Sequence, residues 1–203
     1  MLIKINAQNP QSRLVTQVAE ILMRGGIIAY PTDTYYGIGC DIMNKKAIEH
    51  IYRLKKRDQS KPFSFICSDL KNISDYAKVT NYAYKTMRRL LPGPYTFILE
   101  GSKLVPKIML TKRKTAGIRV PDHPLVQAML EALGEPIMSS TLSLPGDTMP
   151  LTDPVDIEER IGHQVDVIVD AGPTGIEPTT VLDLTGGSIE VLRRGRGDVS
   201  GLV

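Results

Sequence analysis

The chain has 203 residues, of which 42% are hydrophobic and 23% charged, a balance typical of a soluble globular protein. Its formal net charge of +3 permits a polyanionic partner without requiring one. Its apolar runs are shorter than the roughly 20 residues that span a bilayer, and residues 1–8 lack the apolar core of a signal peptide, so we expect a cytoplasmic protein with no membrane partner.

The first predicted elements lead into a polar loop. Residues 11–24 are predicted to form a helix, because their apolar side chains recur on one face, and the apolar residues 27–30 form a buried strand. Residues 31–41 follow with the sequence Pro-Thr-Asp-Thr-Tyr-Tyr-Gly-Ile-Gly-Cys-Asp. We interpret this stretch as a ligand-binding loop, because strand ends are rigid while loops expose polar groups. The alternative is a strand exit with threonine-based turn capping.

Helices and strands alternate along the rest of the chain. Further helices are predicted over residues 44–53, 70–76, 81–91, 125–133 and 154–161. Further strands are predicted over residues 62–67, 95–99, 115–120, 136–141, 165–170, 180–184 and 188–193, of which the last two form a hairpin. Because the alternation does not follow regular βαβ units, we expect one mixed-sheet α/β domain over residues 1–203.

The polar residues include no evident metal site or activated nucleophile. Cys40 and Cys67 lie in or beside apolar runs and are predicted to be small buried residues. The histidines His50, His123 and His163 are scattered without metal-ligand spacing. An enzyme of this kind would act by positioning reactants and stabilising charge. Nucleotidyl transfer suits that design, because the substrate supplies the nucleophile and Mg²⁺ with cationic side chains stabilises the pyrophosphate.

A basic run over residues 53–62 lies between a predicted helix and a strand. Five of its ten residues are lysine or arginine. An ammonium and a guanidinium two residues apart, as in Lys55 and Arg57, could hold different oxygens of one polyphosphate. The alternative is a solvated helix end whose cations complement the helix dipole.

Other predicted strands carry polar side chains that could contact a ligand. Arg119 lies inside an apolar strand, where a charge must be paired or face a cavity, so it is a candidate carboxylate clamp or a member of a structural ion pair. Residues 138–143 bring a run of hydroxyls out of a strand, to cradle a ligand or to cap turns. Thr179 and Arg193 repeat this combination near the C-terminus.

Six short motifs follow one another in a defined order at residues 31–41, 55–57, 92–96, 117–121, 179–184 and 192–195. Their order and spacing resemble those of YrdC/YciO-type proteins, the threonylcarbamoyl-AMP synthase superfamily, over nearly the whole chain. The resemblance implies a twisted, mixed open sheet flanked by helices around a large, basic, concave cavity (the YrdC/RibB-like fold).

The resemblance also implies an activity. Enzymes of this superfamily convert ATP, L-threonine and bicarbonate into threonylcarbamoyl-AMP and pyrophosphate for t6A modification of tRNA, so ATP is expected as a substrate together with Mg²⁺. The alternative is a non-catalytic protein that binds double-stranded RNA, tRNA or the ribosome through the same cavity. A third option is another amino acid or small carboxylate in the Arg119 pocket. We expect a monomer or a weak dimer.

The matching motif positions imply roles for individual residues. Those expected at the threonine are Thr34, Tyr36, Arg119, Ser139 and Thr179. Those expected at the nucleotide are Lys55, Arg57, Lys61, Thr141, Ser143 and Arg193. Lys55 and Arg57 are expected to stabilise charge, and no residue is assigned as a general acid or base.

The chain departs from the superfamily pattern at one position. The synthases carry Ser-x-Asn in the hydroxyl loop, whereas Ser143 occupies the asparagine position here. A serine hydroxyl is shorter than an asparagine amide and cannot supply both its donor and its acceptor. Losing such a contact costs on the order of 1–3 kcal/mol if its partner stays buried and unpaired. The departure indicates the YciO branch and a weakened synthase activity.

Overall fold

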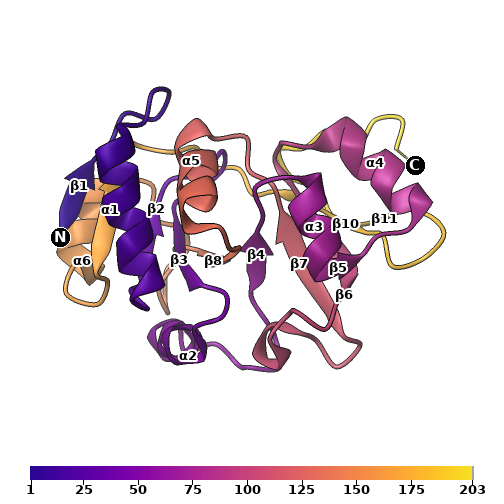
Figure 1. Ribbon diagram of the computed structural model, residues 1–203, viewed down its shortest axis with the longest axis horizontal. Coiled ribbons are helices and arrows are strands. Elements are labelled where there is room, and N and C mark those ends of the chain that lie inside the picture. Colours follow the sequence, from indigo (N-terminus) through magenta and orange to yellow (C-terminus); the bar gives the residue numbers. More distant parts are fainter. Residues whose placement is uncertain (203) are drawn as a thin grey trace.

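The computed structural model describes residues 1–202 as a single α/β domain built on one large sheet (Figure 1). Its helices are α1 (Ser12–Met23), α2 (Lys45–Leu54), α3 (Leu70–Tyr76), α4 (Asn81–Leu90), α5 (Pro124–Leu133) and α6 (Pro154–Ile161), with a short 3₁₀ helix η1 (Lys107–Met109). The first strands are β1 (Leu2–Lys4), β2 (Ile28–Tyr30), β3 (Gly37–Asp41), β4 (Ser64–Ile66), β5 (Ala77–Lys78) and β6 (Tyr95–Gly101). The remaining strands are β7 (Thr115–Arg119), β8 (Ile137–Thr141), β9 (Val167–Asp170), β10 (Thr180–Asp183) and β11 (Glu190–Arg193).

The sheet is mixed, as the irregular alternation of elements predicts. Its strand order is β1-β9-β2-β3-β8-β4-β7-β6-β10-β11, and β5 pairs with β6 beside this path. Four pairs are parallel (β1 with β9, β9 with β2, β4 with β7, and β6 with β10), and the other pairs are antiparallel. Six of the nine neighbouring pairs in this order join strands that are not consecutive in the sequence, so the sheet depends largely on long-range pairing.

Alternating side chains divide the core into two apolar clusters. In β2, Ile28 and Tyr30 join a cluster with α1 and α5, whereas Ala29 between them joins a larger cluster on the other face. In β4, Ile66 and Phe65 divide in the same way. This is the period of two that a strand buried on both faces requires. Helices α1 and α5 pack together over the first cluster, in front of β2, β3 and β8 (Figure 1).

Most predicted elements are confirmed within a few residues, and α3 and α6 have the predicted bounds. The strands β1 and β5 and the helix η1 were not predicted. The prediction of a loop over residues 31–41 is wrong in part, because Gly37–Asp41 forms strand β3 and only residues 31–36 are a loop. Its glycines are needed for close packing: a Cβ on Gly39 would lie 2.4 Å from the carbonyl oxygen of Met138 in the paired strand β8.

Two smaller expectations concern cysteines and membranes. Cys40 and Cys67 are free and fully buried, as predicted, and burial raises the pKa of both thiols far above the ordinary value. Within residues 1–202, the helices are too short or too polar to cross a bilayer.

Candidate functional site

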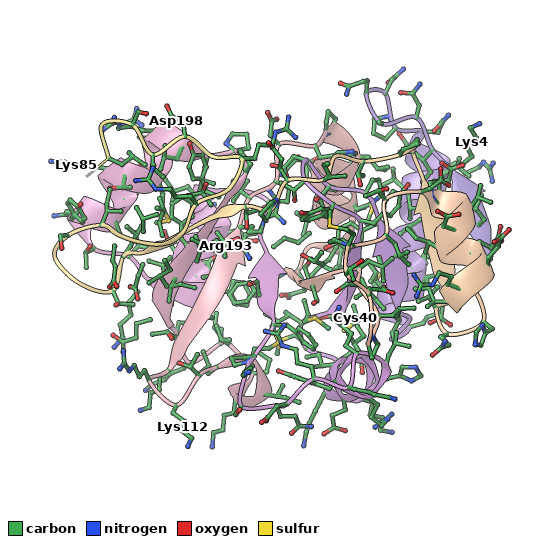
Figure 2. The ribbon with its side chains drawn as sticks, turned by 180° about the vertical axis from the view of Figure 1, so that it is seen from behind. Lys4, Cys40, Lys85, Lys112, Arg193 and Asp198 are labelled. Atoms are coloured by element: carbon green, nitrogen blue, oxygen red, sulfur yellow. The ribbon has the colours of Figure 1, made fainter. Side chains whose placement is uncertain are left out.

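A cavity of about 310 Å³ lies over six neighbouring strands, β8, β4, β7, β6, β10 and β11. Its lining residues are Lys55, Arg57, Pro62, Phe63, Ser64, Thr96, Ile98, Arg119, Ser139, Ser140, Thr141, Ser143, Thr179, Val181 and Arg193. In β6, Thr96 and Ile98 face the cavity while Phe97 between them joins the larger apolar cluster. The cavity therefore occupies the sheet face opposite that part of the core. Figure 2, which shows the molecule from behind, labels its lining residue Arg193.

Lys55 joins the end of α2 to the hydroxyl loop after β8. Its ammonium donates hydrogen bonds to the carbonyl oxygens of Thr141 and Ser143, each at 2.7 Å, and lies 3.4 Å from the Ser143 hydroxyl. Burial, together with the neighbouring charge of Arg57, lowers the pKa of Lys55 to about 8. Lys55 therefore holds the loop at the cavity wall, with a positive charge beside its hydroxyls.

Arg57 is positioned by its own loop. Its Nε donates a 2.8 Å hydrogen bond to the Lys61 carbonyl oxygen, and its Nη2 donates to the Pro62 carbonyl oxygen at 3.3 Å. The guanidinium carbon lies 4.9 Å from the centroid of the Phe63 ring, within the range of a cation–π interaction. These contacts hold the exposed guanidinium at the cavity mouth.

Arg119 combines the two interpretations drawn from the sequence, because it forms an ion pair and also lines the cavity. Its Nη2 lies 2.6 Å from Oδ1 of Asp33 and donates to the hydroxyl of Thr34 at 3.3 Å. Burial lowers the pKa of Arg119, while the Asp33 charge opposes that shift. Its Nε is buried and has no hydrogen-bond partner among the described residues, so one donor remains for a ligand acceptor.

Arg193 and the threonines beside it close another side of the cavity. Its Nε and Nη2 donate to the Thr179 carbonyl oxygen at 3.1 and 2.9 Å, and Nη2 also donates to the Thr179 hydroxyl at 3.0 Å. The Thr96 and Thr179 hydroxyls share a hydrogen bond of 2.8 Å. This network links β6 and β11 to the residue that precedes β10.

Ser139 is oriented by a tyrosine that the sequence analysis did not single out. The Tyr30 hydroxyl donates a 2.6 Å hydrogen bond to Ser139 Oγ in the interior. Burial raises the pKa of Tyr30 to about 12, so it remains a neutral donor. Gly37 lies against both groups, because a Cβ there would be 3.1 Å from the Tyr30 ring and 3.3 Å from Ser139 Oγ.

Most of the predicted site residues converge on this cavity. The lining includes Lys55, Arg57, Arg119, Ser139, Thr141, Ser143, Thr179 and Arg193. The remaining three, Thr34, Tyr36 and Lys61, are not among its lining residues. Thr34 is buried behind Arg119, and the Tyr36 hydroxyl donates to the Gly172 carbonyl oxygen at 2.9 Å.

Lys61 lines a neighbouring basic hollow of about 400 Å³. This hollow is formed by Lys55, Lys56, Arg57, Asp58, Lys61, Ser143, Leu144 and Pro145. It shares Lys55, Arg57 and Ser143 with the cavity, so the two spaces adjoin.

Several lining residues escaped sequence reasoning, among them Phe63, Ser64 and Thr96, whereas Ser140 belongs to the hydroxyl run of residues 138–143 that was considered as a ligand cradle. Thr96 lies within the 92–96 motif, so its hydroxyl at the start of a strand was a usable signal. Ser64 had none, because its direction depends on the pairing of β4 with β7 and β8.

The chemistry of the cavity suits an anionic ligand. It is lined by four cationic side chains, Lys55 and Arg57 from the basic loop and Arg119 and Arg193 from the sheet. Among the described lining residues, none carries a carboxylate. Residues 1–202 also contain no cluster of three histidine, cysteine, aspartate or glutamate side chains that could hold a metal ion. The site therefore fits phosphates and carboxylates, and it does not fit a resident metal.

Comparisons with known proteins cover nearly the whole chain. The Sua5–YciO–YrdC family model, described as "Telomere recombination", matches residues 20–195. The uncharacterized protein YciO of Escherichia coli K12 is 47% identical over 196 residues, which are 96% of this chain and 95% of YciO. The crystal structure of E. coli YciO matches with a TM-score of 0.95 at 46% identity, covering 100% of this chain and 99% of that one.

Two more distant relatives carry functional descriptions. A threonylcarbamoyl-AMP synthase of Vibrio vulnificus YJ016 is 33% identical over 156 residues, which are 75% of this chain and 83% of that protein. The crystal structure of P. abyssi Sua5 complexed with L-threonine matches with a TM-score of 0.89 at 25% identity. That match covers 96% of this chain and 57% of the Sua5 chain.

Proposed function

Because the chain belongs to the Sua5–YciO–YrdC family, which includes threonylcarbamoyl-AMP synthases, we propose that it forms threonylcarbamoyl-AMP and pyrophosphate from ATP, L-threonine and bicarbonate. The observation that carries the proposal is the convergence of Lys55, Arg57, Arg119 and Arg193 on one cavity with the hydroxyls of β8 and Thr179. Four cationic groups suit a triphosphate and an amino-acid carboxylate, and neither ligand alone requires all of them.

The proposed reaction needs no nucleophile from the protein. The amino nitrogen of threonine bonds to the carbon of bicarbonate, and water leaves to give a carbamate. A carbamate oxygen then bonds to the α-phosphorus of ATP while the bond from that phosphorus to the bridging oxygen breaks, which releases pyrophosphate. The side chains orient the two substrates and stabilise the negative charge that develops.

The geometry favours a division of the cavity between the substrates. Arg119 has an unpartnered Nε and is held by Asp33, so we assign it to the threonine carboxylate. Lys55 and Arg57 border both the cavity and the adjoining basic hollow, so we assign them to the phosphates. The family member P. abyssi Sua5 has been crystallised with L-threonine, which supports threonine as the amino acid.

Magnesium is proposed only as a component of the MgATP substrate. Mg²⁺ commonly binds through substrate phosphates and water with one or two carboxylates. The described cavity residues offer no carboxylate. The phosphates of ATP would therefore hold the Mg²⁺, and Lys55 and Arg57 would bind those phosphates. Every step assigned to this chain is therefore one of binding and orientation.

The activity is expected to be weak, because Ser143 lacks the amide of the asparagine that synthases carry at this position. The proposal is tested by incubating the purified protein with ATP, threonine and bicarbonate and measuring pyrophosphate together with the adenylate by mass spectrometry. We expect slow pyrophosphate release that stops when threonine is omitted. Absence of threonine-dependent release at high protein concentration contradicts the proposal.

Arg57→Ala is the matched variant for this assay. Arg57 is exposed, so its removal leaves the fold intact while it removes one phosphate contact. We expect a fall in release of at least about tenfold, which corresponds to the loss of one charge-assisted hydrogen bond. Release that is unchanged in Arg57→Ala indicates a contaminating enzyme.

A further inference from the structure

The chain leaves the ligand cavity at Arg193 and continues as residues 194–198, which we call the C-terminal segment. Arg193 is the last residue of β11 and lines the cavity. Figure 2 labels Arg193 and Asp198, between which the segment runs. Within it, Nη1 of Arg196 donates a hydrogen bond to the backbone carbonyl oxygen of Asp33. The segment therefore links the end of β11 to the loop that follows β2.

The backbone of the C-terminal segment is fixed against β10 and the residues before it. The Gly195 amide donates to the Thr180 hydroxyl at 3.0 Å, and that hydroxyl donates to the Gly197 carbonyl oxygen at 2.6 Å. The Arg196 amide donates to the Pro178 carbonyl oxygen at 2.8 Å. Arg196 therefore extends from a rigid base, although the residue itself is exposed.

Two glycines allow this segment to lie so close to its neighbours. A Cβ on Gly195 would lie 2.3 Å from the Pro178 carbonyl oxygen, and a Cβ on Gly197 would lie 2.4 Å from the Tyr95 ring. The Tyr95 hydroxyl also donates to the Asp198 carbonyl oxygen at 2.9 Å. The segment is thus held in place on both sides of its arginine.

Asp33 lies between two guanidinium groups. Arg196 contacts its backbone carbonyl, and Arg119 contacts its carboxylate at 2.6 Å. The second carboxylate oxygen accepts a hydrogen bond from the Asp122 amide at 3.3 Å. Among the described residues, Arg196 is the only donor to the Asp33 carbonyl. Without it, only the side chain of Asp33 would hold this residue in place.

The other hydrogen bonds of this loop do not replace the contact with Arg196. Thr32 Oγ1 donates to the Tyr35 carbonyl oxygen at 2.7 Å and accepts from the Thr34 amide at 3.1 Å. These bonds close the turn around Asp33 from within. The contact with Arg196 ties the backbone at the tip of the turn to another part of the molecule.

We propose that Arg196 is a positioning residue of the ligand cavity, which holds the Asp33 backbone and thereby fixes the guanidinium of Arg119. Arg196 is not among the lining residues, so it acts through Asp33 and not on the ligand. The Nε of Arg119 is buried and unpartnered among the described residues, so a shift of this guanidinium redirects the donor that a ligand meets. The identification of that ligand as L-threonine rests on the proposed function, whereas the positioning does not.

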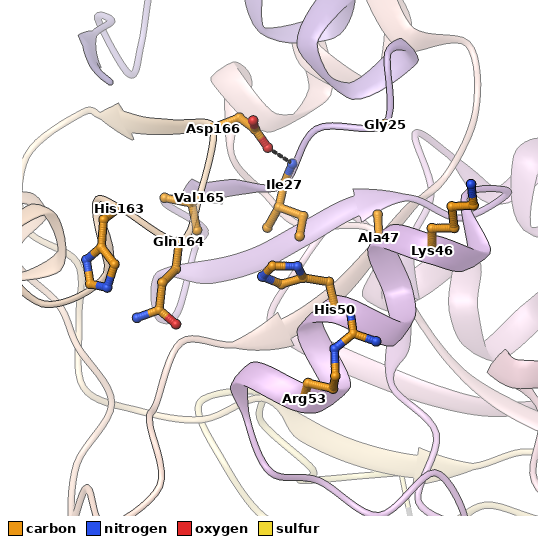
Figure 3. A pocket seen from close by; sticks show the side chains of 10 residues that line it. All are labelled: Gly25, Ile27, Lys46, Ala47, His50, Arg53, His163, Gln164, Val165 and Asp166. Atoms are coloured by element: carbon orange, nitrogen blue, oxygen red, sulfur yellow. Dashed lines mark hydrogen bonds between the residues drawn. The ribbon is translucent and has the colours of Figure 1, made fainter.

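Two controls separate this contact from a general effect of surface charge. Arg194 is also exposed, lies in the same segment and makes no ion pair or side-chain hydrogen bond among the described residues. Arg194→Ala therefore removes the same charge and leaves the contact with Asp33. Arg53 lines a separate hollow of about 490 Å³ beside α2, which shares no lining residue with the ligand cavity (Figure 3). Arg53→Ala removes an exposed arginine there.

The first test measures threonine affinity by calorimetry in the presence of ATP, and ATP affinity separately. We expect Arg196→Ala to weaken threonine binding by about tenfold, because a charge-assisted hydrogen bond is lost, and to change ATP affinity by no more than about twofold. Arg196→Lys retains a cationic donor and should recover most of the threonine affinity. Arg194→Ala and Arg53→Ala should bind threonine as the unmodified protein does.

Three results of this titration overturn the inference. The first is unchanged threonine affinity in Arg196→Ala when the unmodified protein binds threonine. The second is an equal loss in Arg194→Ala or Arg53→Ala, which would indicate a general charge effect. The third is an Arg196→Lys variant as weak as Arg196→Ala, which would contradict a hydrogen bond from this position.

Hydrogen–deuterium exchange of the ligand-free protein tests the positioning without any ligand. We expect the peptide that contains residues 31–36 to exchange faster in Arg196→Ala than in the unmodified protein or in Arg194→Ala. Unchanged exchange of this peptide overturns the inference. If the unmodified protein binds no threonine, the proposed function fails, and the exchange result still decides whether Arg196 holds the Asp33 loop.

Discussion

Nη2 of Arg119 lies 2.6 Å from Oδ1 of Asp33, joining the end of β7 to the loop that follows β2. Both side chains are largely inaccessible, with 12% and 8% of their surfaces exposed. The Asp33 backbone carbonyl also accepts a hydrogen bond from Nη1 of Arg196, so the C-terminal segment is tied to the same loop. Asp33 thus holds the arginine in place while leaving its Nε unpartnered beside the cavity.

Removing one member of this pair should destabilise the fold. We expect Arg119→Ala to lower the free energy of unfolding by about 3 kcal/mol, because it leaves the Asp33 carboxylate buried and unpaired. Urea unfolding of Arg119→Ala, Asp33→Ala and the double variant measures the effect. The double variant should lose less unfolding free energy than the two single variants lose together. A loss equal to their sum would show that the two residues are not coupled.

Keeping the charge but changing its shape should affect the ligand more than the fold. Arg119→Lys retains a cation for Asp33 but loses the planar guanidinium that pairs two donors with a carboxylate. We expect the affinity for threonine, measured calorimetrically in the presence of ATP, to fall by about tenfold. The control is Arg113→Lys at an exposed loop position, which should have no effect. Equal threonine affinity in the Arg119→Lys variant would remove Arg119 from the threonine site.

The serine at position 143 should limit the proposed activity. Ser143 Oγ lies 3.4 Å from Lys55 Nζ at the cavity wall. We expect Ser143→Asn to raise threonine-dependent pyrophosphate release by about tenfold, because an amide supplies both a donor and an acceptor. The aspartate in Ser143→Asp has nearly the same shape as asparagine but places a negative charge beside the phosphates. Its rate of pyrophosphate release should therefore fall below that of the unmodified protein. Equal rates in the two variants would contradict a polar contact at this position.

The low pKa of Lys55, about 8 instead of 10.5, predicts how stability depends on pH. Between these two values the unfolded chain binds a proton that the folded protein does not, so this group makes folding more favourable as pH rises from 8 to 10.5. Lys55→Met lacks the titration. The unfolding free energy of the unmodified protein minus that of Lys55→Met should therefore increase across this interval. A difference that is constant with pH would show that the pKa is not lowered.

Gly39 should not tolerate a side chain. A Cβ would lie 2.4 Å from the Met138 carbonyl oxygen and 2.8 Å from Ile137 Cγ2, both in the paired strand β8. We expect Gly39→Ala to lower the thermal midpoint and to cost about 2 kcal/mol, because the strands must move apart. Gly186→Ala is the matched control, since no atom lies within 4 Å of a Cβ there. Equal midpoints for the two variants would contradict the tight β3–β8 packing.

Local pattern was sufficient for the amphipathic helices and for the residue types of the site. The bounds of α3 and α6 follow from apolar periodicity and from the aspartates that cap both helices, which are short-range features. Strand β1 was missed because it has three residues and gains its order by pairing with β9, more than 160 residues away. Strand β3 was taken for a loop because its glycines weaken the strand pattern, although they are what lets it pair closely with β8.

The sequence by itself determined which charges and hydroxyls were available, because these are properties of single residues at motif positions. Only the tertiary structure decided which of them meet. The pairs Asp33 and Arg119, Tyr30 and Ser139, and Lys55 and Thr141 are 86, 109 and 86 residues apart in the sequence. Each contact depends on the order of strands in a mixed sheet, which follows from long-range burial and hydrogen bonding. Local periodicity carries no information about that order.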